Sequence, residues 1–455
     1  MVKQPGISRA TFLKGAAGAA AALTLPGRAL AAGAGHTSAA SWPLPAHDIA
    51  GTRHSAAAPH VLDERWAVGL AGGVPGAAAL TGGIAIAASL GGEVGAFAVA
   101  DGASRWRRSF GTATYGSGAD ARELGFFGGV AVNSGRAVVA SDRVRCLDAH
   151  SGATVWTASP IRTARSDDYF WGPPAIVGGV VLVGSGSGAE LPTARGRVTA
   201  YRLSDGRRLW STPMTPAGGE GGGVLAAPTV DRGLGVVYVG TGSSYGTPVG
   251  SAPGTCSLVA LRIGDGEVAW RDQVYPGDTH GFDFNSAPVL IGPRLLVLAN
   301  KDGFRAWDRL THRRLWHRRL TPSTDSSGAA GPTTGPEGGP VATDGRRVYV
   351  LSNDNDSGTC VAAALEPWTG EPVWRHRLPS FSFTANAAGG DRVFASCADG
   401  VLRVLDAVTG RPVAEASLGD PSTAPPAMTR LSVIVGTGAA PFLPGERLVC
   451  LGPAL

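Results

Sequence analysis

The sequence predicts an all-β fold, an eight-bladed β-propeller whose blades are four-stranded antiparallel sheets. Three observations support this prediction: a short phrase that recurs along the chain, pairs of short apolar strands before each copy, and two half-hairpins near opposite ends of the sequence. Self-similar strand segments with a period of roughly 40–60 residues are the mark of a propeller. A ring of seven blades with a frayed N-terminus is the alternative.

The recurring phrase is a strand, a turn of the Asp-x-x-Thr-Gly type, and a second strand that ends at or near a tryptophan. Its copies are Cys146–Trp156, Ala200–Trp210, Ala260–Trp270, Ala306–Trp316 and Ala364–Trp374, with looser copies at Ala98–Trp106 and Val404–Ala414. Apolar runs on both sides of a tight Asp/Gly turn predict a β-hairpin. We expect the recurrent tryptophan to fill the same slot between blades each time.

Two more short strands precede each hairpin, as in residues 287–299, and complete a blade of four strands. One blade cannot bury both of its faces, so blades pack against neighbours around an axis. Glu446–Leu451 resembles the first half of a hairpin, and Val61–Trp66 resembles the missing second half. We expect these segments to pair and to close the ring, which hides the sheet edges.

The N-terminal residues predict an export signal outside the fold. Lys3, Arg9 and Lys14 are basic. An apolar stretch follows over 15–25, and small residues at 29–31 suit a cleavage site. The stretch is short for a bilayer span, so we expect no membrane span in the mature protein. We therefore expect an exported protein, either secreted or located in the cell envelope or periplasm.

These features divide the chain into a signal peptide over 1–31, an N-terminal extension over 32–60, and one propeller domain over 61–455. The segment 8–14 is similar to the twin-arginine export motif. Ala10 stands where that motif has its second arginine, so the export route stays open.

Charge and cysteine content narrow the classes of partner. A formal net charge of +5 over 455 residues is small, and no basic patch with interleaved aromatic residues occurs, so we expect no nucleic-acid partner. The five cysteines have no metal-binding spacing and fit the pattern of small buried apolar residues. A bridge between Cys360 and Cys397 is left open.

Candidate site residues fall on one rim of the expected ring. In an antiparallel blade, the loop before the first strand and the loop after the second strand lie on the same side. Glu190, Ser243 and Lys301 each follow a second strand, and Asp283 lies in a loop that enters a first strand. We expect these four residues, together with Trp171, to face one rim.

Nearly the whole chain after the signal peptide resembles the pyrroloquinoline-quinone (PQQ) dehydrogenases and the wider set of PQQ-repeat propellers. The hairpin phrase is similar to the family's repeat, and residues 42–55 look like its Trp…Asp…Thr-Arg-x-Ser opening. The segments that resemble parts of the family's site are 188–201, 238–243, 277–284 and 300–304.

This resemblance implies a role for each candidate residue. Glu190 would bind a calcium ion, and Ser243 stands where the family has an asparagine ligand. Asp283 would be a calcium ligand and the general base that takes the proton of an alcohol. Lys301 would contact the quinone oxygens and stabilise charge that grows on them. Trp171 would replace the stacking tryptophan, because Leu225 stands at that tryptophan's position.

The resemblance implies an exported alcohol dehydrogenase that uses PQQ and calcium, similar to those that act on polyvinyl alcohol. Its substrate would be an alcohol or a polymer, and its electron acceptor is unidentified. No Cys-x-x-Cys-His motif occurs, so covalent haem is not expected. The alternative is a non-catalytic propeller that binds a protein or polymer, because fold does not fix function. Glu190 and Asp283 would then be solvated loop acids.

Overall fold

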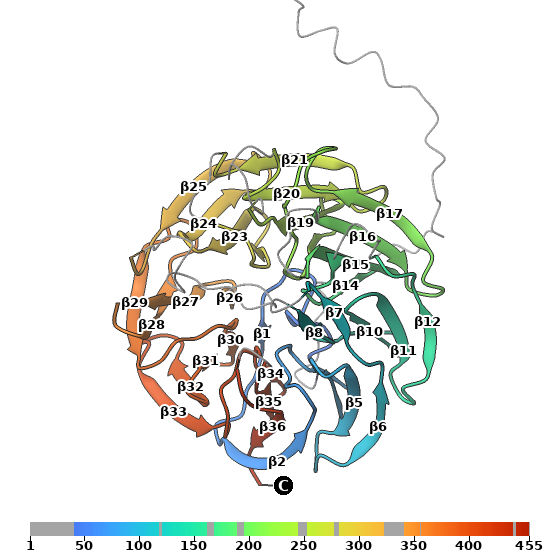
Figure 1. The fold of residues 1–455 in the computed structure, drawn as a ribbon. Helices are drawn as coiled ribbons and strands as arrows, with labels where there is room; N and C mark the ends of the chain where they lie inside the picture. The colour runs from blue at the N-terminus through green and yellow to red at the C-terminus, as the bar shows by residue number, and fades with distance from the viewer. Residues whose placement is uncertain are drawn as a thin grey trace, which may run out of the picture. The chain divides into compact units, whose positions relative to one another are not determined.

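The computed structural model describes residues 41–117, 121–161, 168–188, 195–243, 253–276, 282–322, 341–354, 356–439 and 443–454. Within these residues the chain forms eight four-stranded antiparallel blades around an axis (Figure 1). The described part holds no α-helix, and therefore none long and apolar enough to cross a membrane. The predicted eight-bladed propeller is confirmed.

In blades 1 to 7 the strands follow chain order from the axis outward (Figure 1). Blade 1 contains β3 (Ala79–Thr81), β4 (Ile84–Ala88), β5 (Glu93–Ala98) and β6 (Ser104–Ser109). Blade 2 contains β9 (Ala131–Asn133), β10 (Arg136–Ala140), β11 (Val144–Asp148) and β12 (Thr154–Thr157). Blade 3 contains β14 (Ala175–Val177), β15 (Val180–Ser187), β16 (Arg197–Arg202) and β17 (Arg208–Pro213). Blade 4 contains β18 (Thr229–Asp231), β19 (Val236–Gly240), β20 (Ser257–Arg262) and β21 (Val268–Gln273).

The second half of the ring repeats this order. Blade 5 contains β22 (Val289–Ile291), β23 (Leu295–Asn300), β24 (Gly303–Asp308) and β25 (Arg313–Arg318). Blade 6 contains β26 (Val341–Thr343), β27 (Val348–Asp354), β28 (Thr359–Leu365) and β29 (Pro372–Leu378). Blade 7 contains β30 (Ala387–Gly389), β31 (Arg392–Ser396), β32 (Val401–Asp406) and β33 (Pro412–Ser417). Blade 8 contains β34 (Ala427–Met428), β35 (Val433–Gly436), β36 (Arg447–Gly452) and β2 (Asp63–Gly69).

Four short strands lie outside this pattern. β1 (His54–Ser55) pairs in parallel with β30, and β13 (Asp168–Tyr169) extends blade 3 by pairing with β15. β7 (Ala113–Tyr115) and β8 (Arg122–Leu124) form a separate antiparallel pair.

Blade 8 is built from both ends of the ring. β2 pairs antiparallel with β36 from Asp63 opposite Gly452 to Gly69 opposite Arg447. This pairing confirms the expected closure and gives eight blades rather than seven. Because β2 covers the edge of β36, closure removes that edge as a site for intermolecular strand pairing.

The outer hairpin of blade 7 shows the turn chemistry of the repeat. In blade 7 the Oδ1 atom of Asp406 accepts the backbone N–H groups of Val408 and Thr409, at 3.1 and 2.7 Å. Gly410 then adopts φ of 71°, which a residue without a Cβ does at low cost. The aspartate therefore satisfies the turn, and the glycine reverses the chain into the outer strand.

Six blades are joined to the next by a tryptophan that packs on a turn glycine, an arrangement we call the Trp–Gly joint. The pairs are Trp66–Gly102, Trp106–Gly152, Trp156–Gly206, Trp210–Gly266, Trp316–Gly370 and Trp374–Gly410. At Gly206, an added Cβ would lie only 2.6 Å from Cδ2 of the Trp156 indole. Trp156 Nε1 also donates to the Leu203 carbonyl oxygen at 2.7 Å. The expected inter-blade slot is therefore real, and it depends on glycine.

Two blade contacts depart from this rule. Trp270 of blade 4 stacks on His312 of blade 5, with ring centroids 4.5 Å apart, because histidine occupies the glycine position with φ of 60°. Ala414 of blade 7 faces blade 8, whose β36 and β2 come from opposite ends of the chain and so share no hairpin turn. No turn glycine is available there, which explains why no tryptophan is needed.

Residues 41–55, which we call the N-terminal thread, run along the innermost strands. Their carbonyl groups accept N–H bonds from six blades, at Leu80, Val132, Val230, Leu290, Thr343 and Ala388. Each contact lies in a first strand, near its turn to the second strand. The thread therefore satisfies inner-edge donors at the end of the ring opposite the loops that enter the first strands.

All five cysteines are free and buried. Burial raises the pKa of the Cys146 thiol to about 11, so this thiol stays protonated at neutral pH. The bridge between Cys360 and Cys397 that the sequence left open is not formed.

Candidate functional site

Asp283 and Lys301 meet at the rim, as the loop argument predicts. Lys301 lies in the turn between β23 and β24, and its Nζ is 3.5 Å from Asp283 Oδ2. The other carboxylate oxygen of Asp283 accepts the backbone N–H of Ser243. Both charged side chains are mostly shielded, with 24% and 16% of their surfaces exposed. The structure therefore brings together three residues from blades 4 and 5.

Trp171 lies at the same rim in the segment that enters blade 3. Its Nε1 donates to the Ser187 carbonyl oxygen at 2.7 Å. Its ring makes edge contacts with Phe127 and Tyr169, with centroids 5.2 and 5.0 Å apart. These contacts hold the indole in one orientation, as both rim packing and a role in ligand stacking require.

Glycines connect Trp171 to the Asp283–Lys301 pair. A Cβ added at Gly186 would lie 3.9 Å from Trp171 Cδ1, 2.8 Å from Leu225 Cδ2 and 3.3 Å from Gly223 Cα. A Cβ added at Gly242 would lie 3.5 Å from the Gly223 carbonyl oxygen and 3.3 Å from Asp283 Oδ1. Gly223 therefore lies between Trp171 and the Asp283–Lys301 pair, with the Leu225 side chain beside it.

Asn285 adds an acceptor that the sequence reasoning missed. Its Oδ1 is buried and has no hydrogen-bond partner within the described ranges. A Cβ added at Gly242 would lie 3.4 Å from this oxygen and 3.3 Å from Asp283 Oδ1. Buried acceptors are rarely left unsatisfied unless a water, an ion or a ligand completes them. The Asp-x-Asn spacing was the available signal, because alternate residues of an extended chain face the same side.

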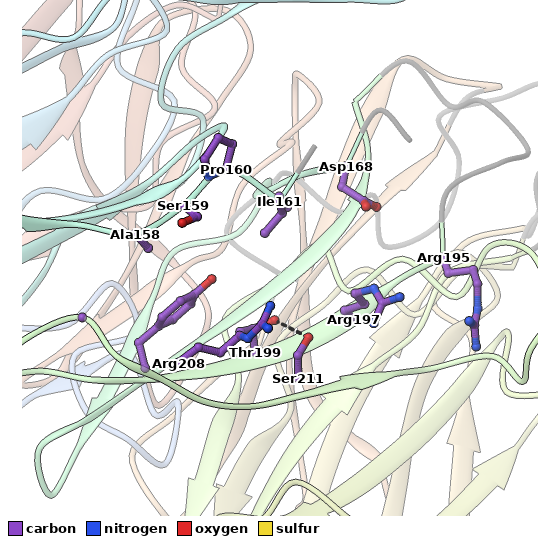
Figure 2. Close-up of a pocket in the computed structure, with 12 residues that line it drawn as sticks. Ala158, Ser159, Pro160, Ile161, Asp168, Arg195, Arg197, Thr199, Arg208 and Ser211 are labelled. Carbon is purple, nitrogen blue, oxygen red and sulfur yellow. Dashed lines mark hydrogen bonds between the residues drawn. The ribbon is translucent and has the colours of Figure 1, made fainter. Parts of the chain in front are cut away.

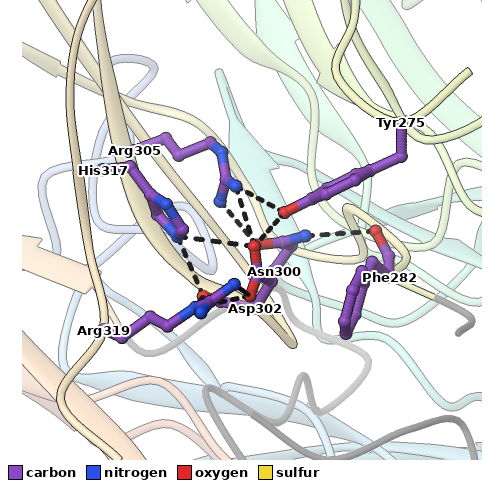
Figure 3. A network of polar contacts seen from close by, with 7 residues as sticks. All are labelled: Tyr275, Phe282, Asn300, Asp302, Arg305, His317 and Arg319. Carbon is purple, nitrogen blue, oxygen red and sulfur yellow. Dashed lines mark hydrogen bonds and ion pairs between the residues drawn. The ribbon is translucent and has the colours of Figure 1, made fainter.

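A second acid, Asp302, directly follows Lys301 in the chain and organises the polar network drawn in Figure 3. Its carboxylate accepts bonds from Arg305 Nη2 at 2.9 Å, from Arg319 Nε at 2.7 Å and from the Tyr275 hydroxyl. His317 Nε2 lies 3.5 Å from the same carboxylate and 2.9 Å from the Asp302 carbonyl oxygen. The sequence analysis singled out Lys301 in this segment but not Asp302, so these contacts were missed.

The network sets the ionisation of its members. Burial opposes the charge of Asp302, but hydrogen bonds from Tyr275 and Arg305 outweigh it and lower the carboxyl pKa below 3.8. Burial, with the charge of Arg305, lowers the pKa of His317 below 6.5. At neutral pH the cluster therefore holds an ionised aspartate and a neutral histidine.

Two of the predicted calcium ligands are described and one is not. Glu190 lies outside the described residues, so its role stays a prediction. Among described residues, no group of three or more His, Cys, Asp or Glu side chains could hold a metal ion. Asp283, Asn285 and Ser243 nevertheless supply a carboxylate, an amide oxygen without a partner and a hydroxyl. These are hard oxygen donors of the kind that calcium prefers, so the donor chemistry fits.

A cavity of about 690 Å³ lies elsewhere, between the outer strands of blades 2 and 3 (Figure 2). Arg195, Arg197 and Arg208 line it, and Thr199 and Ser211 share a hydrogen bond of 2.9 Å in its wall. None of the predicted site residues is among its lining residues. The cavity is therefore distinct from the rim site.

Comparison with known proteins identifies the repeat. A family model described as outer membrane protein assembly factor BamB, built on the PQQ repeat, matches residues 90–332 and 323–454. The two matches together span most of the ring.

Curated relatives include alcohol dehydrogenases. A quinohemoprotein alcohol dehydrogenase from Pseudomonas putida is 31% identical over 201 residues, which are 36% of this chain and 29% of the relative. A polyvinylalcohol dehydrogenase from Pseudomonas sp is 28% identical over 378 residues, 70% of this chain and 55% of the relative. The chain thus spans about half or less of the length of these relatives.

Solved structures agree on the fold. The quinohemoprotein alcohol dehydrogenase of Comamonas testosteroni superimposes with a TM-score of 0.76 at 20% identity, covering 92% of this chain and 82% of that one. BamB from Moraxella catarrhalis gives a TM-score of 0.61 at 17% identity, covering 86% of this chain and 100% of that one. At these identities the likeness shows a shared propeller architecture.

Proposed function

Because the chain belongs to the PQQ-repeat propeller family, we propose that it is an exported alcohol dehydrogenase that uses PQQ and calcium. The observation that carries the proposal is the shielded Asp283–Lys301 pair, joined to Ser243 at one rim. The similarity to a polyvinylalcohol dehydrogenase over 70% of the chain supports alcohol chemistry. We also propose a signal peptide over 1–31 and an extension over 32–60 before the propeller.

The proposed division of labour follows from what each residue offers. Asp283 would take the alcohol proton on its Oδ2, while the Ser243 N–H keeps the other oxygen in place. The ammonium of Lys301 would stabilise negative charge on an acceptor oxygen beside it. Trp171 would offer a rigid aromatic face. PQQ, when bound, would accept the hydride of the alcohol carbon.

Calcium would be held by oxygen atoms around Asp283. Asn285 is the strongest addition to the predicted set, because its Oδ1 is buried without a hydrogen-bond partner among described residues. Ser243 and Glu190 complete the proposed ligands. The substrate we propose is an alcohol, small or polymeric, and the electron acceptor is a separate molecule.

The test begins with binding. Purified protein is mixed with PQQ and calcium, and its melting temperature is measured against calcium alone. A ligand at 100 times its Kd stabilises the native state by about 2.7 kcal/mol, so a clear upward shift is expected. Dye reduction is then measured with short alcohols, diols and polyvinyl alcohol. A protein that shows no shift at high PQQ concentration is a binding module instead.

Asp283→Asn separates catalysis from binding. Removal of a general base costs about 100-fold or more in turnover, so this variant should lose dye reduction while most of the melting shift remains. Asp354→Asn is the matched control, because Asp354 pairs with Arg377 on blade 6 and is remote in sequence from the site. Equal dye reduction by wild type and Asp283→Asn would show that the catalytic assignment is wrong.

A further inference from the structure

We infer that Asp302 is a positioning residue that holds Lys301 and Asp283 in register through one buried polar network. Its consequence for catalysis rests on the proposed function, but the coupling itself does not. Asp302 is distinct from the predicted site residues, and its carboxylate contacts the network rather than Asp283.

The network forms hydrogen bonds to both sequence neighbours of Lys301, which are Asn300 and Asp302. The turn between β23 and β24 consists of Lys301 and Asp302, because Asn300 pairs with Gly303 across it. Asp302 and Asn300 are almost fully buried, with 3% and 0% exposed. A two-residue turn anchored by both neighbours leaves the Lys301 backbone little freedom.

The partners of Asp302 come from three separate segments. Arg305 lies on β24, Arg319 and His317 lie on or just after β25, and Tyr275 follows β21 of the neighbouring blade. Arg305 also stacks over the Tyr275 ring, with its Cζ 5.1 Å from the ring centroid. Asp302 therefore ties the Lys301 turn to the outer strand of its own blade and to blade 4.

The same network reaches the backbone of Asp283. Arg305 Nη1 donates to Asn300 Oδ1 at 3.3 Å, and Asn300 Nδ2 donates to the Phe282 carbonyl oxygen at 3.2 Å. Phe282 directly precedes Asp283. A continuous path therefore runs from the Asp302 carboxylate through Arg305 and Asn300 to the residue before Asp283 (Figure 3).

Charge explains why the carboxylate is needed at the centre. Arg305 is 10% exposed, so its guanidinium depends on a counter-ion. If Asp302 became neutral, Arg305 would lose that counter-ion, and the ion pair would no longer hold its guanidinium toward Asn300. The fixed separation of Asp283 and Lys301 should then relax, because both ends of the path are released together.

The experiment compares Asp302→Asn with Asp272→Asn by hydrogen exchange of the protein without ligand. Asp272 is a matched control: it accepts bonds from Arg314 and Trp307 across the same two blades, and no hydrogen bond joins it to the Asn300–Asp302 turn in the described part. Asp302→Asn should speed amide exchange about 10-fold in both 282–286 and 299–304, as local opening becomes easier. In Asp272→Asn, the exchange rates of these two peptides should keep their wild-type ratio, both to each other and to the rates in the rest of the ring.

Asn300→Ala tests the path if Asp302→Asn fails to fold. It removes the bonds of Asn300 to Phe282 and to Arg305 but leaves the carboxylate partners of Asp302 in place, so amide exchange should rise more in peptide 282–286 than in peptide 299–304. If Asp302→Asn speeds exchange in 299–304 alone, or in neither peptide, the coupling does not exist and the inference is overturned.

Binding and turnover then give the catalytic consequence. A positioning residue should lower kcat about 10- to 100-fold with KM for the alcohol little changed, and Asp302→Glu should recover part of the loss. PQQ affinity, measured by tryptophan quenching, should fall in Asp302→Asn but not in Asp272→Asn. If wild type binds no PQQ, the proposed function fails, while the exchange result still decides the coupling.

Discussion

The contact between blades 2 and 3 and the contact between blades 4 and 5 solve the same packing problem differently. Trp156 packs on Gly206 with its indole N–H bonded to a backbone carbonyl. Trp270 instead stacks on His312. Blades 4 and 5 add side-chain links that the other contact lacks among its described pairs, from Asp272 to Trp307 and to Arg314.

The difference falls in the two blades that carry the candidate site, although His312 lies in the β24–β25 turn, at the opposite end of blade 5 from Lys301. Ser243 belongs to blade 4, Asp283 enters blade 5, and Lys301 lies within blade 5. Between these two blades the Trp–Gly joint is replaced by the stacking of Trp270 on His312. Hydrogen bonds from Trp307 and Arg314 to Asp272 are added, and such bonds fix the orientation of the side chains. Proteins commonly depart from their local rules near functional sites, and this departure falls in the two blades of the candidate site.

The largest expected effect is on the regular joint. Trp156→Ala should lower the free energy of unfolding by about 3–5 kcal/mol, because it empties a buried slot. Trp270→Ala should cost less, since Trp270 is only half-buried. Chemical denaturation of both variants measures the gap, and equal losses would mean that the two contacts are equivalent.

Gly206→Ala tests the other half of the regular joint. The new Cβ would lie 2.6 Å from the Trp156 indole, on a backbone with φ of 73°. Overpacking costs about 1–3 kcal/mol and left-handed backbone about 1–2 kcal/mol, so we expect a total loss near 3 kcal/mol. Gly135→Ala is the control for backbone alone, because it has φ of 73° and open space around its Cβ.

Asp272→Asn tests the polar contact between blades 4 and 5. Charge-assisted hydrogen bonds to Arg314 and Trp307 would be weakened, so unfolding free energy should fall by about 1–2 kcal/mol. The measurement is denaturation at neutral pH in low and high salt. A loss that salt does not reduce would point to packing rather than charge.

Acid should reproduce that change in the wild type. Burial alone would raise the pKa of Asp272. Hydrogen bonds from Arg314 and Trp307 lower it by more than burial raises it, so the pKa lies below its ordinary value of 3.8. A carboxylate with a depressed pKa stabilises the fold above its unfolded pKa, and that contribution is lost as pH falls below 3.8. Stability of wild type and Asp272→Asn should therefore converge in acid, which pH-dependent melting curves would reveal.

The smallest expected effect is that of His312→Gly. It relieves a residue with φ of 60° but removes the stacking on Trp270, so the two terms nearly cancel. We expect a change below about 1 kcal/mol in either direction. A larger loss would show that His312 itself holds the contact between blades 4 and 5.

The repeats made the ring predictable, because each copy contains the pattern of its strands, its turn and the tryptophan that packs on the next blade. The closure of blade 8 also followed from two half-hairpins. The rim pair of Asp283 and Lys301 was predictable from strand direction alone. The links of Asp302 to Tyr275 and Arg319 were not, because they join segments at unrelated spacings and leave no periodic signal. Asn285 is different, because its spacing of two residues from Asp283 was a signal that the sequence reasoning did not use.

The N-terminal thread has a consequence for any polymeric substrate. Because residues 41–55 bind the first strands of six blades, they run across the ring at the end away from the rim site. For the proposed polymeric substrate, the thread would lie on the far side of the ring from the site. A loop or a loose end of the polymer would then reach the site from the rim.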